Sequence, residues 1–413
     1  MGGCGVGGIG SGAGSGSGDG GVSIGGYGSG WDMSARVPVV GRRETPAVAG
    51  APPGAQPVAM APRLRRVDCS APGIRRRKVG RGFVYLDPSG ARVTDTGVLD
   101  RARSLVIPPA WTDVWICVDP HGHIQATGVD ARGRRQYRYH DIWRERRDRE
   151  KFDHMLEFAR ALPKLRHDAR DHLHDDGLTR VRVLACAARL LDLGFFRIGT
   201  EGYAEENQTY GLATMHKRHV KLEPPSTVHF DYTAKGSKRR IQSVVDPEVY
   251  AVVETLKRRR GGKPELLAWS RDREWIDVRS ADINMYIKEV TGGDFSAKDF
   301  RTWNATLLAA VALAVSTGAS SPTARKRAVA RAMKEVAHYL GNTPAVCRSS
   351  YVDPRIVDKY LGGSTIAPAL EQALVGAPAE AAEAGTLLTQ GPIEDAVLDL
   401  LEDNVTVRVE VAS

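Results

Sequence analysis

The sequence predicts an α+β protein, with a small β-rich N-terminal domain followed by a larger, mainly helical domain that holds a small antiparallel sheet. Two observations predict this division. Between residues 75 and 140, short apolar segments are separated by Asp-Pro-Ser-Gly and Asp-Pro-His-Gly turns, as in a sheet. From residue 141 on, apolar residues recur mostly at helical spacing. A chain of 413 residues is long enough for each domain to bury its own core.

The two ends of the chain differ from this middle part. Residues 1–74 are a Gly-, Ser- and Pro-rich tail that is expected to be disordered, because it cannot bury enough apolar surface to offset its ordering entropy. Met33 or Met60 could be the true start of the protein. Residues 364–413 hold nine acidic residues and one basic residue. We therefore expect 363–413 to be a loose acidic tail with a possible helix at 392–401.

Within the folded part, the periodicity places each element. The strands predicted for the first domain are 82–86, 112–118 and 123–127. The second domain, 141–362, is expected to open with a helix and to include a long apolar-faced helix at 181–196. Its predicted strands are 210–215, 220–222, 227–233 and 240–245, the last two forming a hairpin around 234–239. Beyond Pro247 the chain is predicted to be helical to about 361, with breaks at 261–264, 292–293, 318–321 and 341–344.

The charge of the chain favours a polyanionic partner. The formal net charge is +9 and the pI is about 9.3. Because the C-terminal 50 residues are acidic, the excess of Lys and Arg lies before residue 364. A surface of this kind suits nucleic acid, although a protein can also be basic without binding one.

The cysteines and apolar runs indicate a cytoplasmic protein without a membrane partner. The five cysteines are odd in number and form no Cys-x-x-Cys or Cys/His spacing, which argues against a disulfide framework and a zinc site. They are Cys4, Cys69, Cys117, Cys186 and Cys347. The most apolar run, 305–315, is too short to span a bilayer, and no signal peptide is recognised at the N-terminus.

Common catalytic motifs are missing from the sequence. It contains no GxxxxGK[ST], no GxGxxG between strand and helix, no HExxH and no DxD pair. ATP hydrolysis and two-metal phosphodiester cleavage therefore lose support, and neither a cofactor nor a metal is expected. The His/Asp run at 167–176 could bind a metal, but such a run is more often a solvated helix face.

Two arginines are placed where a phosphate could be held without a metal. Arg197 lies between an apolar helix and a glycine turn, and Arg301 leads directly into the apolar run 305–315. The planar guanidinium can donate two parallel hydrogen bonds to a phosphate. The alternative is a pair of structural ion pairs, Arg197 with Glu201 and Arg301 with Asp299.

A resemblance to a known family gives these arginines a context. The segment 339–354, YLGNTPAVCRSSYVDP, resembles the active-site stretch of the type IB DNA topoisomerases, in their compact poxvirus and bacterial branch. In that stretch Leu-Gly is followed by His or Asn, and the reactive tyrosine comes nine positions later, here Asn342 and Tyr351. Further resembling segments are Arg197 with Gly199, Lys235 in TAKG, Arg301 in KDFRT, 107–114 and 133–139. The resemblance covers about 78–362.

The resemblance implies a mechanism and a role for each of these residues. Tyr351 would attack a DNA phosphate and form a 3′-phosphotyrosyl link, so that supercoils relax without ATP. Arg197, Arg301 and Asn342 would donate to the phosphate oxygens, and Lys235 would protonate the leaving 5′ oxygen as general acid, with Lys238 as the rival. Asn342 stands where the viral relatives have histidine and can donate a hydrogen bond but not hold a proton. Tyr339 and Tyr360, which lie beside leucines on helices, are expected in the core.

The resemblance also implies how DNA is held. The expected DNA-binding residues are Gly199 and the alternating basic and aromatic run Arg134, Arg135, Gln136, Tyr137, Arg138 and Tyr139. Without the resemblance, this run could be a solvated strand edge. The implied architecture is a two-lobed clamp that encircles double-stranded DNA and acts as a monomer.

Two other classes of protein share part of this pattern. A tyrosine recombinase would use the same chemistry, but it usually has His-x-x-Arg where this chain has Lys298 three positions before Arg301, and its N-terminal domain is helical. A DNA- or RNA-binding protein without catalytic activity is the second alternative. A Tyr351→Phe variant separates this last class, because binding alone would be unchanged.

Overall fold

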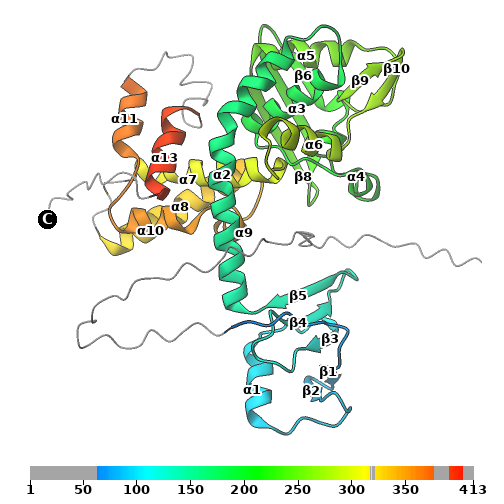
Figure 1. Ribbon diagram of the computed structural model, residues 1–413, viewed down its shortest axis with the longest axis vertical. Helices are drawn as coiled ribbons and strands as arrows, with labels where there is room; N and C mark the ends of the chain where they lie inside the picture. Colours follow the sequence, from blue (N-terminus) through cyan, green and yellow to red (C-terminus); the bar gives the residue numbers. More distant parts are fainter. Residues whose placement is uncertain (1–62, 317, 319–320, 376–389, 403–413) are drawn as a thin grey trace, which may run out of the picture. The chain divides into compact units, whose positions relative to one another are not determined.

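The computed structural model describes residues 63–316, 318, 321–375 and 390–402. The chain divides into two compact units, Met1–Arg146 and Arg147–Ser413 (Figure 1). The first is a small sheet with one short helix, and the second is mainly helical with two small antiparallel sheets. The α+β class predicted from the sequence is therefore confirmed.

The first unit is built on a five-stranded antiparallel sheet with the order β2-β1-β3-β4-β5. Helix α1 begins where the Asp95 side chain accepts a hydrogen bond from Val98 N, and its Ala102 packs against Ile116 and Ala126 of the sheet. The elements are β1 (Ile74–Val79), β2 (Gly82–Leu86), α1 (Thr96–Ser104), β3 (Thr112–Ile116), β4 (Ile124–Val129) and β5 (Arg135–Tyr139).

The helices of the second unit surround one large core. Its centre includes Trp303 and Phe300 of α7 and Phe158 of α2, and the rings of Phe158 and Phe300 meet edge to face at 4.9 Å. The helices are α2 (Asp141–Leu173, which begins in the first unit), α3 (Arg180–Gly194), α4 (Glu201–Asn207), α5 (Pro247–Arg258), α6 (Ser280–Thr291), α7 (Ala297–Ala314), α8 (Pro322–Leu340), α9 (Pro344–Ser350), α10 (Pro354–Leu361), α11 (Ala367–Val375) and α13 (Pro392–Glu402), with 3₁₀ turns at Leu212–Thr214 and Lys217–His219.

Two small sheets complete the second unit. One has the order β6-β7-β8, and its β7–β8 hairpin turns at Lys235–Ser237, inside the predicted turn. The other is a two-stranded ribbon. The strands are β6 (Val220–Glu223), β7 (Thr227–Ala234), β8 (Lys238–Val245), β9 (Ala268–Arg271) and β10 (Glu274–Asp277).

The last described helix is fastened to the core by a buried carboxylate. Glu394 of α13 is 7% exposed and accepts hydrogen bonds from Trp303 Nε1 at 2.8 Å and from Arg166 Nη2 at 2.9 Å. Arg166 also binds Asp192 through two hydrogen bonds. Helix α13 packs against α7, α10 and α11.

Four expectations about the elements were wrong or incomplete. The segment 210–215 is a loop with a 3₁₀ turn rather than a strand. The β9–β10 ribbon interrupts a region expected to be helical, because its turn uses Asp272 and Arg273 at positive φ in place of the usual Asn or Gly. Strand β1 and helix α1 were not predicted.

The tails also differ from expectation where they are described. The C-terminal segment is not loose at 367–375, where α11 packs on α7, whereas the helix predicted at 392–401 is present as α13. At the other end, Arg65 bridges to Gly122, so folded structure begins before residue 75. Residues 1–62, which make up most of the tail predicted to be disordered, lie outside the described part of the chain.

Candidate active site

Tyr351 stands at the end of α9, held by backbone contacts to α7 and α9. Its N–H donates to Cys347 O at 3.0 Å, and its carbonyl accepts a hydrogen bond from Thr306 Oγ1 of α7 at 3.3 Å. Helix α9 starts at Thr343, whose side chain accepts from Val346 N, and Pro344 occupies the first helical position. The phenol is therefore carried on a short helix that is capped at one end and anchored at the other.

Arg301 is a buried cation beside this phenol. It is 5% exposed, and its guanidinium carbon lies 5.4 Å from the centre of the Tyr351 ring. It donates from Nη1 to Phe195 O at 2.6 Å and from Nη2 to Leu340 O at 2.8 Å. Burial, together with the charge of Arg197, lowers the pKa of Arg301 to about 10, so that the group is still a cation at neutral pH.

Arg197 and Asn342 meet at the C-terminal end of α8. Gly341 ends that helix with φ +64°, the left-handed conformation that glycine adopts readily, and Asn342 follows it. Arg197, which follows α3 on the other side, donates from Nη2 to Asn342 Oδ1 and to Gly341 O, the latter at 3.4 Å. Arg197, Arg301 and Asn342, which lie far apart in the sequence, therefore meet at the C-terminal end of α8.

The interpretation of these arginines as structural ion pairs is wrong. The carboxylate of Asp299 accepts from Ser296 N and Oγ, at 2.8 and 2.9 Å, and helps to start α7. The carboxylate of Glu201 accepts from Ser280 N at 2.8 Å. Both guanidiniums bind neutral carbonyls instead, which leaves their positive charge uncancelled.

Arg240 of β8 is a third arginine at this helix end, and it was not predicted. It donates to His338 O at 3.0 Å and to Tyr339 O at 2.5 Å. Four consecutive carbonyls, 338–341, are therefore bound by Arg240, Arg301 and Arg197. Its strand alternates between an exposed and a packed face, and counting from buried Val244 would have placed Arg240 on the packed side.

Two buried hydrogen-bond donors at this site have no acceptor among the described residues. They are Arg301 Nε and Asn342 Nδ2. Buried donors are normally satisfied, and an anion carries the acceptor atoms that such donors need. Burial by itself would raise the pKa of the Tyr351 phenol, but the charges of Arg301 and Arg197 outweigh it and bring that pKa below its ordinary value of 10.0.

Lys235 is not buried with this group. It lies exposed in the turn of the β7–β8 hairpin, and Lys238 is exposed one strand position beyond the turn. The same hairpin reaches the site close to its tip, through Arg240, which lies opposite buried Tyr232. The structure therefore brings together four of the five predicted catalytic residues and connects the fifth to them through its hairpin.

Comparisons with known proteins identify the family of this chain. The family model described as the catalytic core of eukaryotic DNA topoisomerase I matches residues 140–362, and that of the bacterial DNA topoisomerase IB N-terminal domain matches 82–130. DNA topoisomerase 1B of Acanthamoeba polyphaga mimivirus is 32% identical over 294 residues, which are 70% of this chain and 87% of the viral protein. The chain belongs to the type IB DNA topoisomerases.

Longer eukaryotic members of the family match over a smaller part. DNA topoisomerase 1 of Schizosaccharomyces pombe is 31% identical over 159 residues, or 38% of this chain and 18% of the yeast protein. DNA topoisomerase 1 beta of Arabidopsis thaliana is 26% identical over 203 residues, or 49% of this chain and 21% of the plant protein. Membership makes the protein an isomerase, and it does not support the alternatives of a recombinase or a non-catalytic binding protein.

In this topoisomerase the expected DNA-binding residue Gly199 has a packing role. Its φ is +74°, and a Cβ there would lie 2.7 Å from the Cα of Gly211 and 2.8 Å from its nitrogen. A side chain would push apart two backbone segments that follow Arg197. Contact of Gly199 with DNA remains a prediction.

The predicted DNA-binding run lies on β5 and just before it, in the first unit. Arg134 pairs with Asp130 at 2.7 Å, and this hydrogen bond lowers the pKa of Asp130 to about 2. Tyr137 is 43% exposed, and its ring lies 6.1 Å from that of Tyr139. Arg135 is exposed, Gln136 donates to Asp130, and Arg138 pairs with Asp141 at 3.1 Å. The run presents cations and two rings along one strand.

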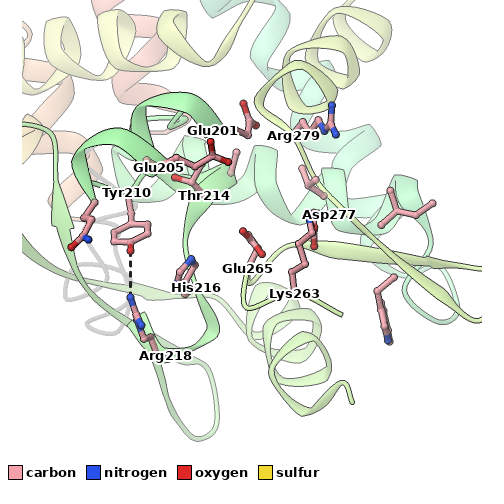
Figure 2. A pocket seen from close by; sticks show the side chains of 16 residues that line it. Glu201, Glu205, Tyr210, Thr214, His216, Arg218, Lys263, Glu265, Asp277 and Arg279 are labelled. Carbon is pink, nitrogen blue, oxygen red and sulfur yellow. Dashed lines mark hydrogen bonds and ion pairs between the residues drawn. The ribbon is translucent and has the colours of Figure 1, made fainter. Parts of the chain in front are cut away.

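A large cavity of the second unit contains none of the predicted catalytic residues. It has a volume of about 860 Å³ and is lined by α4, by the loop around Tyr210 and by β10 (Figure 2). Glu265 and Asp277 contribute to its wall, and each has a buried carboxylate oxygen without a donor among the described residues. The other oxygen of Asp277 pairs with Lys263 at 3.4 Å.

The described residues show neither a metal cluster nor a membrane-spanning helix. No group of three or more His, Cys, Asp or Glu side chains is arranged to hold a metal ion in the part of the chain that the structure covers. The His/Asp run includes an exposed pair, His167 with Asp171 at 3.5 Å. None of the described helices is both long enough and apolar enough to cross a membrane.

Proposed function

We propose that this protein relaxes supercoiled DNA by cutting and rejoining one strand through a 3′-phosphotyrosyl intermediate on Tyr351, without ATP or a metal ion. The observation that carries the proposal is the Tyr351 phenol set against buried Arg301, with two unused donors beside it. A free tyrosine is a poor nucleophile at neutral pH, and these cations favour its phenolate.

In the proposed reaction, Tyr351 Oη attacks the phosphorus and the P–O5′ bond breaks. Lys235 gives a proton to the departing 5′ oxygen, and the exposed tip of the hairpin suits a group that must reach toward the DNA. The phosphotyrosyl ester conserves the energy of the phosphodiester bond. Religation is therefore the same reaction in reverse and requires no ATP.

Stabilisation of the transition state is assigned to Arg197, Arg301 and Asn342. Positive charge and fixed donors are most effective where they do not have to reorganise, and these groups are held by carbonyls on rigid helix ends. Guanidiniums can supply the positive charge that a metal ion supplies in other phosphoryl-transfer sites. Asn342 acts in this scheme as a hydrogen-bond donor only.

The N-terminal unit is proposed to hold the duplex through Arg134, Arg135, Gln136, Tyr137, Arg138 and Tyr139. Cations along a strand suit the phosphate backbone, and the exposed ring of Tyr137 suits a base or a sugar. We further propose that both units enclose the DNA, that a monomer suffices, and that the protein acts on the DNA of a bacterial cytoplasm and nucleoid. The match to a bacterial N-terminal domain supports this last point.

The decisive experiment is relaxation of a supercoiled plasmid in EDTA without ATP. We expect supercoils of both signs to relax, and a denatured reaction to leave DNA on Tyr351 through a 3′-phosphate with a free 5′-hydroxyl. Tyr351→Phe should reduce relaxation by at least about 10⁴-fold. An absolute need for magnesium or ATP, a 5′ link, or an adduct on Tyr339 or Tyr360 would refute the proposal.

A substrate with a 5′-bridging phosphorothiolate tests the general acid. Its thiolate leaves without a proton, so it needs no acid. Lys235→Ala should cleave ordinary DNA about 10²–10⁴-fold more slowly and recover most of that loss on the phosphorothiolate. Lys238→Ala is the matched control from the same hairpin. If Lys238→Ala is the variant rescued, the acid is Lys238.

A further inference from the structure

Arg240 comes from the hairpin that carries Lys235 and is bound to the helix end that presents Asn342. It donates from Nη1 to His338 O at 3.0 Å and from Nη2 to Tyr339 O at 2.5 Å. The last carbonyls of a helix lack donors within the helix and form the negative end of its dipole. A guanidinium there is held by hydrogen bonds and by charge together.

A second side chain of the same strand face binds the neighbouring helix. Gln242 accepts from Arg240 Nη2 at 2.9 Å and donates from Nε2 to Gly194 O, at the end of α3, at 2.7 Å. Helix α3 leads into Arg197, as α8 leads into Asn342. The hairpin is therefore attached to both helix ends from which the site is built.

The attachment lies close to the tip of the hairpin. Arg240 is paired with Tyr232, and the last pair before the turn, Ala234 with Lys238, is two residues further along. At about 3.3 Å per residue, the two pairs are roughly 7 Å apart. The turn itself is tight, with Gly236 and Ser237 both at positive φ. A short, paired hairpin of this kind transmits the position of Arg240 to Lys235.

We propose that Arg240 is a positioning residue for DNA cleavage, which fixes the Lys235 hairpin against the helix end that carries Asn342. The inference rests on the proposed function of Lys235 as general acid. The Nη donors of Arg240 are directed at two carbonyls and an amide oxygen, so it acts through the geometry of the hairpin. Loss of its side chain removes the two bonds to the end of α8, so that the tip of the hairpin and Lys235 are held less firmly.

The neighbouring Arg239 offers a matched control. It lies on the opposite face of β8, its side chain is 70% exposed, and it pairs with Asp231 at 2.6 Å. Single-turnover cleavage with excess enzyme is measured for wild type, Arg240→Ala, Arg239→Ala and Lys235→Ala, on ordinary and 5′-phosphorothiolate DNA. Arg240→Ala should slow ordinary cleavage about 10- to 100-fold, recover much of that loss on the phosphorothiolate, and bind DNA as wild type does. Arg239→Ala should stay within about twofold of wild type on both substrates.

The outcomes separate this inference from the function it rests on. Equal rates for Arg240→Ala and Arg239→Ala would overturn the positioning role. So would a slow Arg240→Ala that gains nothing from the phosphorothiolate while Lys235→Ala is rescued, because Arg240 would then act on the phosphate. A Lys235→Ala variant without rescue would refute the general acid itself. If Arg240→Ala does not fold, as judged by its Tm, the same measurements are made on Arg240→Lys and Arg239→Lys. The cleavage rate of Arg240→Lys should then lie between those of wild type and Lys235→Ala.

Discussion

The site around Tyr351 and the cavity beside Glu265 lie in the same unit and differ in which polar atoms they leave unsatisfied. At Tyr351 the unused groups are donors, Arg301 Nε and Asn342 Nδ2. In the cavity they are carboxylate oxygens of Glu265 and Asp277, together with one ring nitrogen of His216 (Figure 2). The cavity is large, but its unused acceptors repel a phosphate, whereas the unused donors attract one. The kind of unsatisfied atom therefore identifies a phosphate site better than volume does.

The cations near Tyr351 also differ from those elsewhere in the unit in the groups that they bind. Arg301 and Arg197 bind carbonyls, which are dipoles without net charge, so the full positive charge remains available. In the cavity, Lys263 is paired with the carboxylate of Asp277. In the core, Arg166 is neutralised by Asp192 and Glu394. An arginine that is buried without a carboxylate is costly, and a bound phosphate would offset that cost at Arg301. Arg259, which is also buried and binds only carbonyls, shows that this arrangement occurs away from Tyr351 as well.

Among the variants that test this comparison, Arg301→Ala should reduce DNA cleavage the most. It removes a fixed cation and an unused donor at the proposed phosphate site. We expect single-turnover cleavage to fall about 10²–10³-fold. Recovery on the 5′-phosphorothiolate should be much smaller than for Lys235→Ala, because the phosphate oxygens need the cation whichever atom leaves. Rescue as complete as that of Lys235→Ala would contradict the assignment.

The pH dependence of cleavage tests whether Arg301 acts on the phenol of Tyr351. Nearby cations favour the phenolate and so lower the pKa of Tyr351, and cleavage by wild type should rise with pH with a midpoint below the ordinary tyrosine value of 10.0. Arg301→Ala should move the midpoint to higher pH, since the phenolate loses a cation. Arg182, which also binds two carbonyls but lies in the first turn of α3, is the control. An unchanged midpoint in Arg301→Ala would mean that the cation does not act on the phenol.

A smaller effect, on binding rather than chemistry, is expected from the strand in the first unit. Replacing Arg134, Arg135 and Arg138 together by alanine removes cations that are proposed to neutralise DNA phosphates. DNA affinity should fall, and the slope of log affinity against log salt should shrink by about one for each phosphate that is no longer neutralised. Cleavage of DNA that is already bound should change little. A constant slope with a collapse of cleavage would count against the proposed role of this strand.

The smallest effect is expected in the cavity. Glu265→Gln removes the charge of a carboxylate that has an oxygen without a donor among the described residues. Relaxation should stay within about twofold of wild type. The Tm should rise, since a charge without a partner costs stability when partly buried. A large loss of relaxation would show that the cavity takes part in the reaction, and it would contradict the distinction drawn between the cavity and the site at Tyr351.

Much of the fold and the site could be predicted from the sequence because the signals were local. The hairpin of Lys235, the helix break at Gly341 and the apolar run after Arg301 are all visible in short windows. The spacing from Asn342 to Tyr351 is equally local, since one short helix joins them.

The features that could not be predicted from the sequence depend on contacts between segments that lie far apart in it. Arg240 became a candidate only when the structure placed it on carbonyls nearly 100 residues away, since the neighbouring Arg239 of the same strand carries the same charge. The ion pairs considered as the alternative for Arg197 and Arg301 are absent for the same reason, since the partners of both arginines come from other segments. The acidic composition of the C-terminal segment gave no sign that Glu394 would be buried against Trp303.

That buried glutamate has a consequence for the order in which the protein becomes active. A ribosome makes Glu394 43 residues after Tyr351, which takes roughly 2 to 9 seconds at normal rates of synthesis. Until then Trp303 and Arg166 lack the acceptor that completes the interior next to α7, the helix that carries Arg301. The nascent chain thus holds every proposed catalytic residue before it holds the packing that keeps them in place. The ability to cut DNA is expected to arise only after α13 has been made.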